Sequence, residues 1–197
     1  MLADLETVRN DVAGRPLSGP GIVTNGHKAP AIAGKDRLII RMARSDEAPA
    51  IVELTNAIFS GKTHLSGASF ANSREIERLM TQGKFLLAQS DNEIVGCAYV
   101  EPHLEASRLG LLAVTPSRQR AGIGSQLLDA AERLSSSMQC LFMHLQVMNL
   151  QCETIRFCRR RGYMEFGIES LNKSQPISLQ CHFVRMCKRL ETDRWAF

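Results

Sequence analysis

The residue types that could do chemistry are concentrated between Leu111 and Leu128. An apolar, strand-like run ends at Val114, and Pro116 then cannot donate a ladder hydrogen bond and favours a turn. Residues 119–124 read Gln-x-x-Gly-x-Gly and lead into an amphipathic helical pattern. The first turn of a helix leaves backbone N–H groups without intrahelical partners, with the positive end of the helix dipole behind them. The pattern therefore predicts a binding site for a phosphate or pyrophosphate group.

The side chains around this turn fit an anionic ligand. Gly122 and Gly124 lack side chains, so phosphate oxygens can approach the backbone closely. Arg118 and Arg120 add positive charge at the mouth of the turn. The dinucleotide-binding fingerprint is excluded because Leu127 stands where its third glycine is required, and this turn has no Gly-Lys-Ser/Thr of a P-loop.

Length and charge limit the class of protein that carries the turn. The chain has 197 residues, enough for one domain with a hydrophobic core. Its formal net charge of +4 suits a small anionic ligand and is too small to predict nucleic-acid binding. No apolar run approaches the roughly 20 residues that a membrane helix needs, and the N-terminus lacks the apolar segment of a secretory signal. We therefore expect a cytoplasmic protein with neither a nucleic-acid nor a membrane partner.

The cysteines do not form a pattern typical of disulfides or zinc sites. The sequence has six cysteines and five histidines, but no Cys-x-x-Cys pair. The cysteines lie in or beside apolar runs or in a helical stretch, so we expect free thiols. No metal site is expected.

Hydrophobic periodicity divides the chain into an extension and one domain. Residues 1–36 are rich in Gly, Pro and Ala and show little periodicity, which predicts a flexible or loosely docked extension. Residues 37–197 predict a domain with the element order β-α-α-β-β-β-α-β-α-β-β. We expect strands at residues 37–42, 84–89, 94–100, 107–114, 141–147, 163–168 and 181–188. We expect helices at about residues 46–58, 72–83, 120–135 and 152–161.

The succession of apolar strand, Val-x-Pro, Gln-x-x-Gly-x-Gly and helix resembles the signature motif of the GNAT superfamily of acyl-CoA-dependent N-acyltransferases. The element order from about Arg37 to Leu190 is similar to that fold, and the stretch from Ile155 to Tyr163 resembles its later helix. The resemblance implies an α+β fold in layers. Its central, twisted sheet would be mixed but mostly antiparallel, with about six to seven strands and about four flanking helices.

The resemblance also implies an activity, which is direct attack of an amine on acetyl-CoA, the co-substrate, without an acyl-enzyme. Backbone N–H groups from Gln119 to Ser125 would hold the CoA pyrophosphate, and the edge of the preceding strand would bind the pantetheine arm as an added strand. The N–H of Val114 would polarise the thioester carbonyl. The implied CoA-binding residues are Leu112, Ala113, Val114, Gln119, Arg120, Ala121, Gly122, Ile123, Gly124, Ser125, Asn149 and Phe157.

The groups that would move protons depart from the family pattern. Many relatives have a tyrosine that serves as the acid just after the helix position of Phe157, and this chain has Cys158 there. A thiol, with an ordinary pKa of about 8.5, can donate a proton, but Cys158 equally fits a packed helix residue. We therefore take Cys158 as the candidate acid with both interpretations open.

The base is equally open. Many relatives have a glutamate six residues before the equivalent of Val114, where this chain has Arg108. Glu101 and Glu105 are the nearest acids and become the candidate bases, against the alternative that they are solvated loop carboxylates. His103 is a third candidate on the same footing, and His144 is expected to line the core or a cleft.

Three functions remain after this reading of the residues. The first is an N-acetyltransferase acting on a small-molecule or peptide amine. The second is a catalytically weak, CoA-binding regulatory or interaction module, and the third is an enzyme that uses the same turn for a nucleotide. The acceptor cannot be named from the residues, and a possible homodimer would pair through a late strand.

Overall fold

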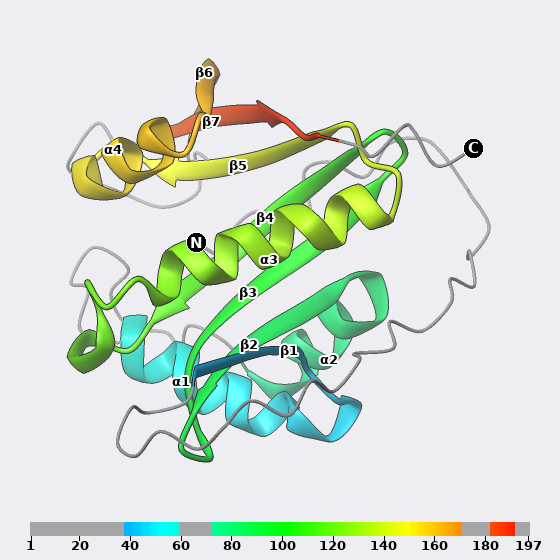
Figure 1. The fold of residues 1–197 in the computed structure, drawn as a ribbon, viewed down its shortest axis with the longest axis vertical. Coiled ribbons are helices and arrows are strands. Elements are labelled where there is room, and N and C mark those ends of the chain that lie inside the picture. The colour runs from blue at the N-terminus through cyan, green and yellow to red at the C-terminus, as the bar shows by residue number, and fades with distance from the viewer. Residues whose placement is uncertain (1–37, 60–71, 171–181, 192–197) are drawn as a thin grey trace, which may run out of the picture.

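The computed structural model describes residues 38–59, 72–170 and 182–191, and within these ranges the chain forms one sheet with helices on both faces (Figure 1). The sheet has seven strands in the order β1-β2-β3-β4-β5-β7-β6. The strands are β1 Leu38–Met42, β2 Lys84–Ser90, β3 Glu93–His103, β4 Ala106–Val114, β5 Phe142–Met148, β6 Met164–Ser170 and β7 His182–Arg189. The helices are α1 Ala48–Phe59, α2 Ser73–Gln82, α3 Ile123–Ser137 and α4 Cys152–Arg160, with short 3-10 turns at Ser45–Glu47 and Pro116–Arg118.

The pairing of the strands confirms the predicted mixed, mostly antiparallel sheet. Neighbouring strands pair antiparallel except β4 and β5, which are parallel and are joined by α3. A parallel pair needs such a crossover, whereas the β2–β3 hairpin closes with a tight turn. That turn uses Asp91 and Asn92, both with positive φ, as a two-residue hairpin loop requires.

Each face of the sheet has its own apolar layer. One layer packs α3 and α4 on β2 to β5 and β7, with Leu127, Leu128 and Met143 fully buried. The other packs α1 and α2 on β2, β3 and β4, with Ile51, Ile76 and Leu87 fully buried. Figure 1 shows α3 lying across the sheet on one side, with α1 and α2 on the opposite side.

A bulge in β4 changes which residues face each layer. Leu109 packs in the layer of α3, yet Leu111 and Ala113 pack in the layer of α1 and α2. The register with β3 shifts here, and Leu111 has a φ of 49°. A β-branched or bulky residue with positive φ is strained, and such strain is common at functional sites. Beyond the bulge, Leu112 and Val114 therefore point toward α3.

Among the predicted boundaries, the start of α3 needs correction, the end of α2 at Gly83 is confirmed, and two segments fall outside the described residues. Helix α3 begins at Ile123 rather than near Arg120, because Arg120 and Gly122 have φ values of 63° and 80°, which interrupt a right-handed helix. Gly83 ends α2 in an extended conformation, and it must be glycine because a Cβ would lie 2.4 Å from the carbonyl oxygen of Val100. The extension at residues 1–36 and the loop between β6 and β7, residues 171–181, lie outside the described residues.

Candidate active site

The two central parallel strands separate beside the predicted turn. β4 and β5 pair over four positions, ending at Leu109 with Leu145. β4 continues to Val114, still paired with β3, but without β5 on its other side. Figure 1 shows the two strands together at the right and diverging to the left, where α3 begins. Residues 110–114 of β4 therefore present an open strand edge, which an extended ligand can join by backbone hydrogen bonds.

The N–H of Val114 points into this opening. The N–H of Thr115 donates to the carbonyl oxygen of Val95 in β3 at 2.9 Å, and Val114 is the Cα partner of Gly96. In an antiparallel ladder hydrogen-bonded pairs alternate with non-hydrogen-bonded pairs, so the polar backbone groups of Val114 point away from β3. An N–H in this position can donate to a carbonyl oxygen of a ligand lying between the strands.

The turn after β4 presents a row of unused backbone donors. The N–H groups of Arg118 and Gln119 close the 3-10 turn, and that of Gln126 bonds Gly122. Within the described part of the chain, the N–H groups from Arg120 to Ser125 have no hydrogen-bond acceptor. No side chain caps α3, because its N-cap residue is Gly122. Exposed donors at the start of a helix are suited to binding an anion.

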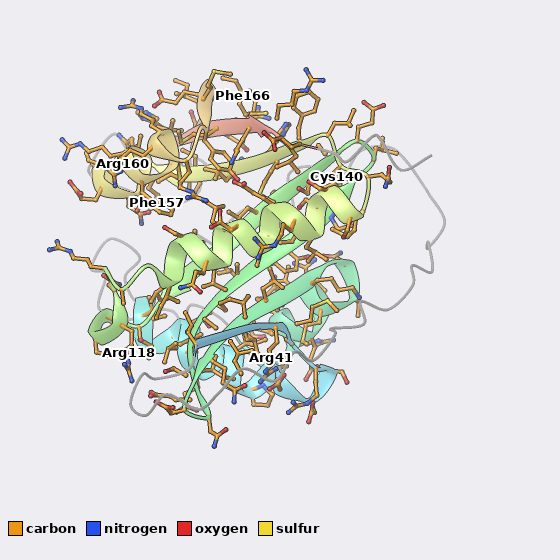
Figure 2. The ribbon with its side chains drawn as sticks, viewed as in Figure 1. Arg41, Arg118, Cys140, Phe157, Arg160 and Phe166 are labelled. Carbon is orange, nitrogen blue, oxygen red and sulfur yellow. The ribbon has the colours of Figure 1, made fainter. Side chains whose placement is uncertain are left out.

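The space above this turn is open. A Cβ built on Gly122 would meet no heavy atom within 4 Å, and one built on Gly124 would first meet Val114 at 3.9 Å. The site therefore fits the pyrophosphate of CoA, because it offers unused backbone N–H donors and open space next to them. Figure 2 shows Arg118 at the outer side of the turn, where positive charge lies close to such a ligand.

Two of the predicted CoA-binding residues, Asn149 and Phe157, form the far wall of the site and lie beyond the end of β5. Asn149 forms two hydrogen bonds with His182 in β7. Its backbone N–H donates to the His182 carbonyl oxygen at 2.9 Å, and its Oδ1 accepts from the His182 backbone N–H at 3.2 Å. This pair fixes the end of β5 against β7. Phe157 is half-buried and packs on the apolar layer of α3, and Figure 2 shows it on the side of α4 toward α3. The structure thus places both residues on the β5 side of the opening.

Comparison with known proteins agrees with this geometry. The model of the acetyltransferase (GNAT) domain matches residues 81–165, which include β4, the turn, α3 and β5. This match shows that the central part of the chain is similar to the GNAT acetyltransferase domain. An amino-acid acetyltransferase of Pseudomonas putida is 26% identical over 155 residues, covering 76% of this chain and 33% of the relative. The chain thus spans about a third of the length of the amino-acid acetyltransferases it matches.

Solved GNAT structures share the fold. The ribosomal-protein-S18-alanine N-acetyltransferase of Escherichia coli has a TM-score of 0.68 at 14% identity, with 82% of this chain and 99% of that chain covered. A GNAT family acetyltransferase of Elizabethkingia anophelis, solved with acetyl-CoA bound, has a TM-score of 0.64 at 21% identity, with 79% and 100% covered. At these identities the likeness establishes the fold of this chain.

The two carboxylates predicted as bases lie in different surroundings. Glu101 is buried, 9% exposed, and its carboxylate bonds Arg108 at 2.6 Å and His103 at 3.2 Å. Burial opposes the charge of Glu101, but the bonds to His103 and Arg108 outweigh it and lower its pKa to about 2. Glu105 is exposed in the β3–β4 turn, at the opposite end of β4 from the opening. The structure therefore does not bring Glu105 to the turn that holds the anion site.

Cys158, the predicted acid, lies inside the apolar layer of α3 and α4. Its side chain is 2% exposed and belongs to the same buried cluster as Ile155 and Tyr163. Burial raises the pKa of the Cys158 thiol to about 11, so the thiol is protonated at neutral pH. It has a proton to give but little access to a ligand.

Sequence reasoning missed a polar surface on the other face of the sheet. Arg108 and His144 are Cα partners on β4 and β5, and both alternate with residues that face α3. Further along β5, the Gln146 amide donates to Glu169 of β6 at 2.7 Å, and Arg185 of β7 lies 3.9 Å from the same carboxylate. Only the alternation of polar residues within apolar strands signalled these positions.

The described residues also limit other chemistries. Among them, no group of three or more His, Cys, Asp or Glu side chains is placed to hold a metal ion. None of the helices in the described ranges is long and apolar enough to span a membrane.

Proposed function

We propose that this GNAT domain transfers an acetyl group from acetyl-CoA to a primary amine by direct attack in a ternary complex. The observation that carries the proposal is the row of unused N–H groups from Arg120 to Ser125, next to the open edge of β4. The pyrophosphate would bind these donors, and the pantetheine arm would lie along residues 112–114. The acetyl carbonyl would accept a hydrogen bond from Val114, which stabilises the charge that develops on attack.

The residues of the far wall would complete the site. Asn149 and Phe157 lie on the β5 side of the opening, so they would contact the pantetheine arm from that side. Acetyl-CoA supplies a thioester whose leaving group is the CoA thiolate. The residues of this chain would bind acetyl-CoA, orient it and exclude water. Glu101 is then left as a carboxylate whose charged form is held by His103 and Arg108, and Cys158 as a thiol that burial keeps protonated.

The names of the relatives favour an α-amino group as the acceptor. One set of relatives is called amino-acid acetyltransferase, and one structural neighbour is a ribosomal-protein-S18-alanine N-acetyltransferase. Both names describe a primary amine next to a carbonyl group. We therefore propose a free amino acid or a protein N-terminus as the acceptor of this chain.

The experiment that tests the function measures CoA thiol release with a panel of amino acids and short peptides. Turnover above the rate of acetyl-CoA hydrolysis supports the proposed function. Tight CoA binding by calorimetry without any turnover supports the second candidate, a CoA-binding regulatory module. The Glu101–Arg108 ion pair favours this candidate, because Arg108 stands where many relatives have a glutamate base and its guanidinium engages Glu101. Stronger binding of ATP than of CoA would contradict both.

The proposed homodimer would use β6. This strand lies at one edge of the sheet, and Met164, Phe166 and Ile168 are exposed on it. An exposed apolar edge strand is a template for pairing with another chain. Light scattering should give twice the monomer mass, and Ile168→Lys should return the monomer.

A further inference from the structure

A polar row crosses the face of the sheet that carries α1 and α2. On β5, Met143 and Leu145 are buried in the layer of α3, so His144 and Gln146 point to the opposite face. Arg185 alternates in the same way between Val184 and Met186 on β7. The apolar layer of α1 and α2 covers only β2, β3 and β4 of this face. Among the described residues, therefore, no helix covers His144.

His144 lies at the point where the two central strands part. It is the Cα partner of Arg108, and the next pair, Leu109 with Leu145, is the last before β4 and β5 separate. His144 thus stands one residue before the open edge of β4. It faces the side of the sheet opposite α3, whose first turn carries the anion site.

The imidazole ring of His144 is held by stacking rather than by hydrogen bonds. Its centroid lies 5.3 Å from that of Phe166 at an interplanar angle of 48°, and the guanidinium of Arg185 lies 4.6 Å from the Phe166 centroid. Figure 2 shows Phe166 extending from β6. Within the described ranges no hydrogen bond engages either ring nitrogen of His144. The ring is therefore fixed in place with its nitrogens available.

The charges around His144 keep its ring neutral. Burial lowers the pKa of His144, and the Arg185 cation lowers it further. The other charged groups on this face are already engaged: Glu169 on β6 bonds Gln146, and Arg108 on β4 bonds Glu101 on β3. Cys187, the Cα partner of His144 on β7, has a raised pKa because of burial and stays a neutral thiol.

We propose that His144 is the general base of the acetyl transfer. The proposal rests on the proposed function, because it needs an amine acceptor on this face of the sheet. A neutral ring nitrogen of His144 takes a proton from the acceptor ammonium, directly or through one water. The free amine attacks the carbonyl carbon, a C–N bond forms and the C–S bond breaks. The second proton of the amine nitrogen passes to the departing thiolate, and His144 then releases its own proton to solvent.

The carboxylates predicted from sequence are weaker bases for this step. Glu101 has a pKa of about 2 because Arg108 and His103 hold its charged form. Such a carboxylate has little tendency to take a proton near neutral pH, whereas an imidazole with a pKa closer to the working pH is suited to it. His144 is also nearer to the separation of the strands than Glu105, which lies in the turn at the far end of β4.

The test uses the full chain and two variants at one position. His144→Phe keeps an aromatic ring against Phe166 but cannot accept a proton, and we expect kcat/KM to fall by about 100-fold or more. His144→Glu restores a base and should recover part of the rate. The wild-type profile of kcat/KM against pH should have an acidic limb that His144→Phe lacks. The CoA dissociation constant and the unfolding midpoint should stay near the wild-type values in both variants.

A third variant probes the charge rather than the base itself. Arg185→Gln removes the cation that lowers the pKa of His144, so the acidic limb should move to higher pH. A structural role of His144 would leave that limb where it is. A His144→Phe rate within about twofold of wild type, or an acidic limb that survives in it, overturns the proposal. Wild-type protein that binds CoA but acetylates no amine contradicts the proposed function instead, and the base assignment with it.

Discussion

The side-chain amide of Gln119 donates a hydrogen bond to the carbonyl oxygen of Val114 at 3.0 Å. This bond joins the end of β4 to the turn five residues later. It occupies the carbonyl of the same residue whose N–H points into the opening between the strands. The bond therefore holds the edge of β4 and the turn that follows it in one fixed relation.

Replacing Gln119 with alanine should weaken CoA binding without unfolding the protein. One hydrogen bond at an exposed position is lost, so we expect the CoA dissociation constant to rise roughly three- to tenfold. Calorimetry with CoA measures the change. The matched control is Gln126→Ala, an exposed glutamine on α3 whose side chain has no hydrogen bond among the described residues. Equal CoA affinities in the two variants would remove Gln119 from the site.

Gly122→Leu should abolish CoA binding while leaving the fold intact. A side chain at this residue enters the open space above the turn, where the pyrophosphate would lie. We expect CoA affinity to fall by at least about 100-fold, since close approach to the backbone donors is lost. Positive φ also makes a side chain at Gly122 strained, at a cost of about 1–2 kcal/mol.

A second glycine separates that strain from the loss of binding. Gly162, which follows α4, has a φ of 87° and lies away from the turn. Gly162→Ala should lower the free energy of unfolding by about 1–2 kcal/mol, as Gly122→Ala should, yet leave CoA affinity unchanged. Normal CoA binding by Gly122→Leu would count heavily against the proposed pyrophosphate site.

Two paired carboxylates should make stability depend on acid pH. The bonds to His103 and Arg108 lower the pKa of Glu101 from 4.5 to about 2, and the Arg41 guanidinium does the same for Glu47. A carboxyl whose pKa is lower in the folded than in the unfolded state stabilises the folded protein at pH values above the unfolded-state pKa. This stabilisation is lost as the pH falls from about 4.5 to about 2. Urea unfolding across that range should show the decline.

Glu101→Gln isolates one of these contributions. The variant should be less stable than wild type at pH 7, because Arg108 loses its charged partner. The stability difference between the two proteins should shrink as pH falls toward about 2, where wild-type Glu101 also becomes neutral. A difference that stays constant over this range would contradict the assigned pKa.

The order of the elements could be predicted because each has a local signal. The tight turn at Ser90–Glu93 and the glycine after α4 mark their boundaries, and apolar periods of two residues mark the strands. The turn between β4 and α3 was predictable for the same reason, since its proline and glycines are contiguous in the sequence. The start of α3 was misplaced, because the left-handed conformation of Arg120 is not visible in the residue type. The end of β3 was misplaced as well, since the strand continues past the predicted residue 100 to His103.

The chemistry between strands could not be predicted from the sequence. The bulge at Leu111 reverses the alternation of β4, which no residue type announces because leucine rarely adopts positive φ. The ion pair of Glu101 with Arg108 and the pairing of Arg108 with His144 are set by sheet register, which joins residues 7 and 36 positions apart. Glu101 was therefore taken for a free carboxylate, and His144 for a residue that lines the core or a cleft.

Cys158→Ala tests whether the thiol acts as the acid or only packs. The side chain is 2% exposed inside the cluster of Ile155 and Tyr163, so we expect its loss to lower the free energy of unfolding by about 1 kcal/mol. Because the buried thiol has a pKa of about 11, it should also resist thiol reagents near neutral pH, while exposed Cys152 reacts. We expect the alkaline limb of kcat against pH to be unchanged in the variant. Loss of that limb, with CoA affinity retained, would instead establish Cys158 as the proton donor to the leaving thiolate.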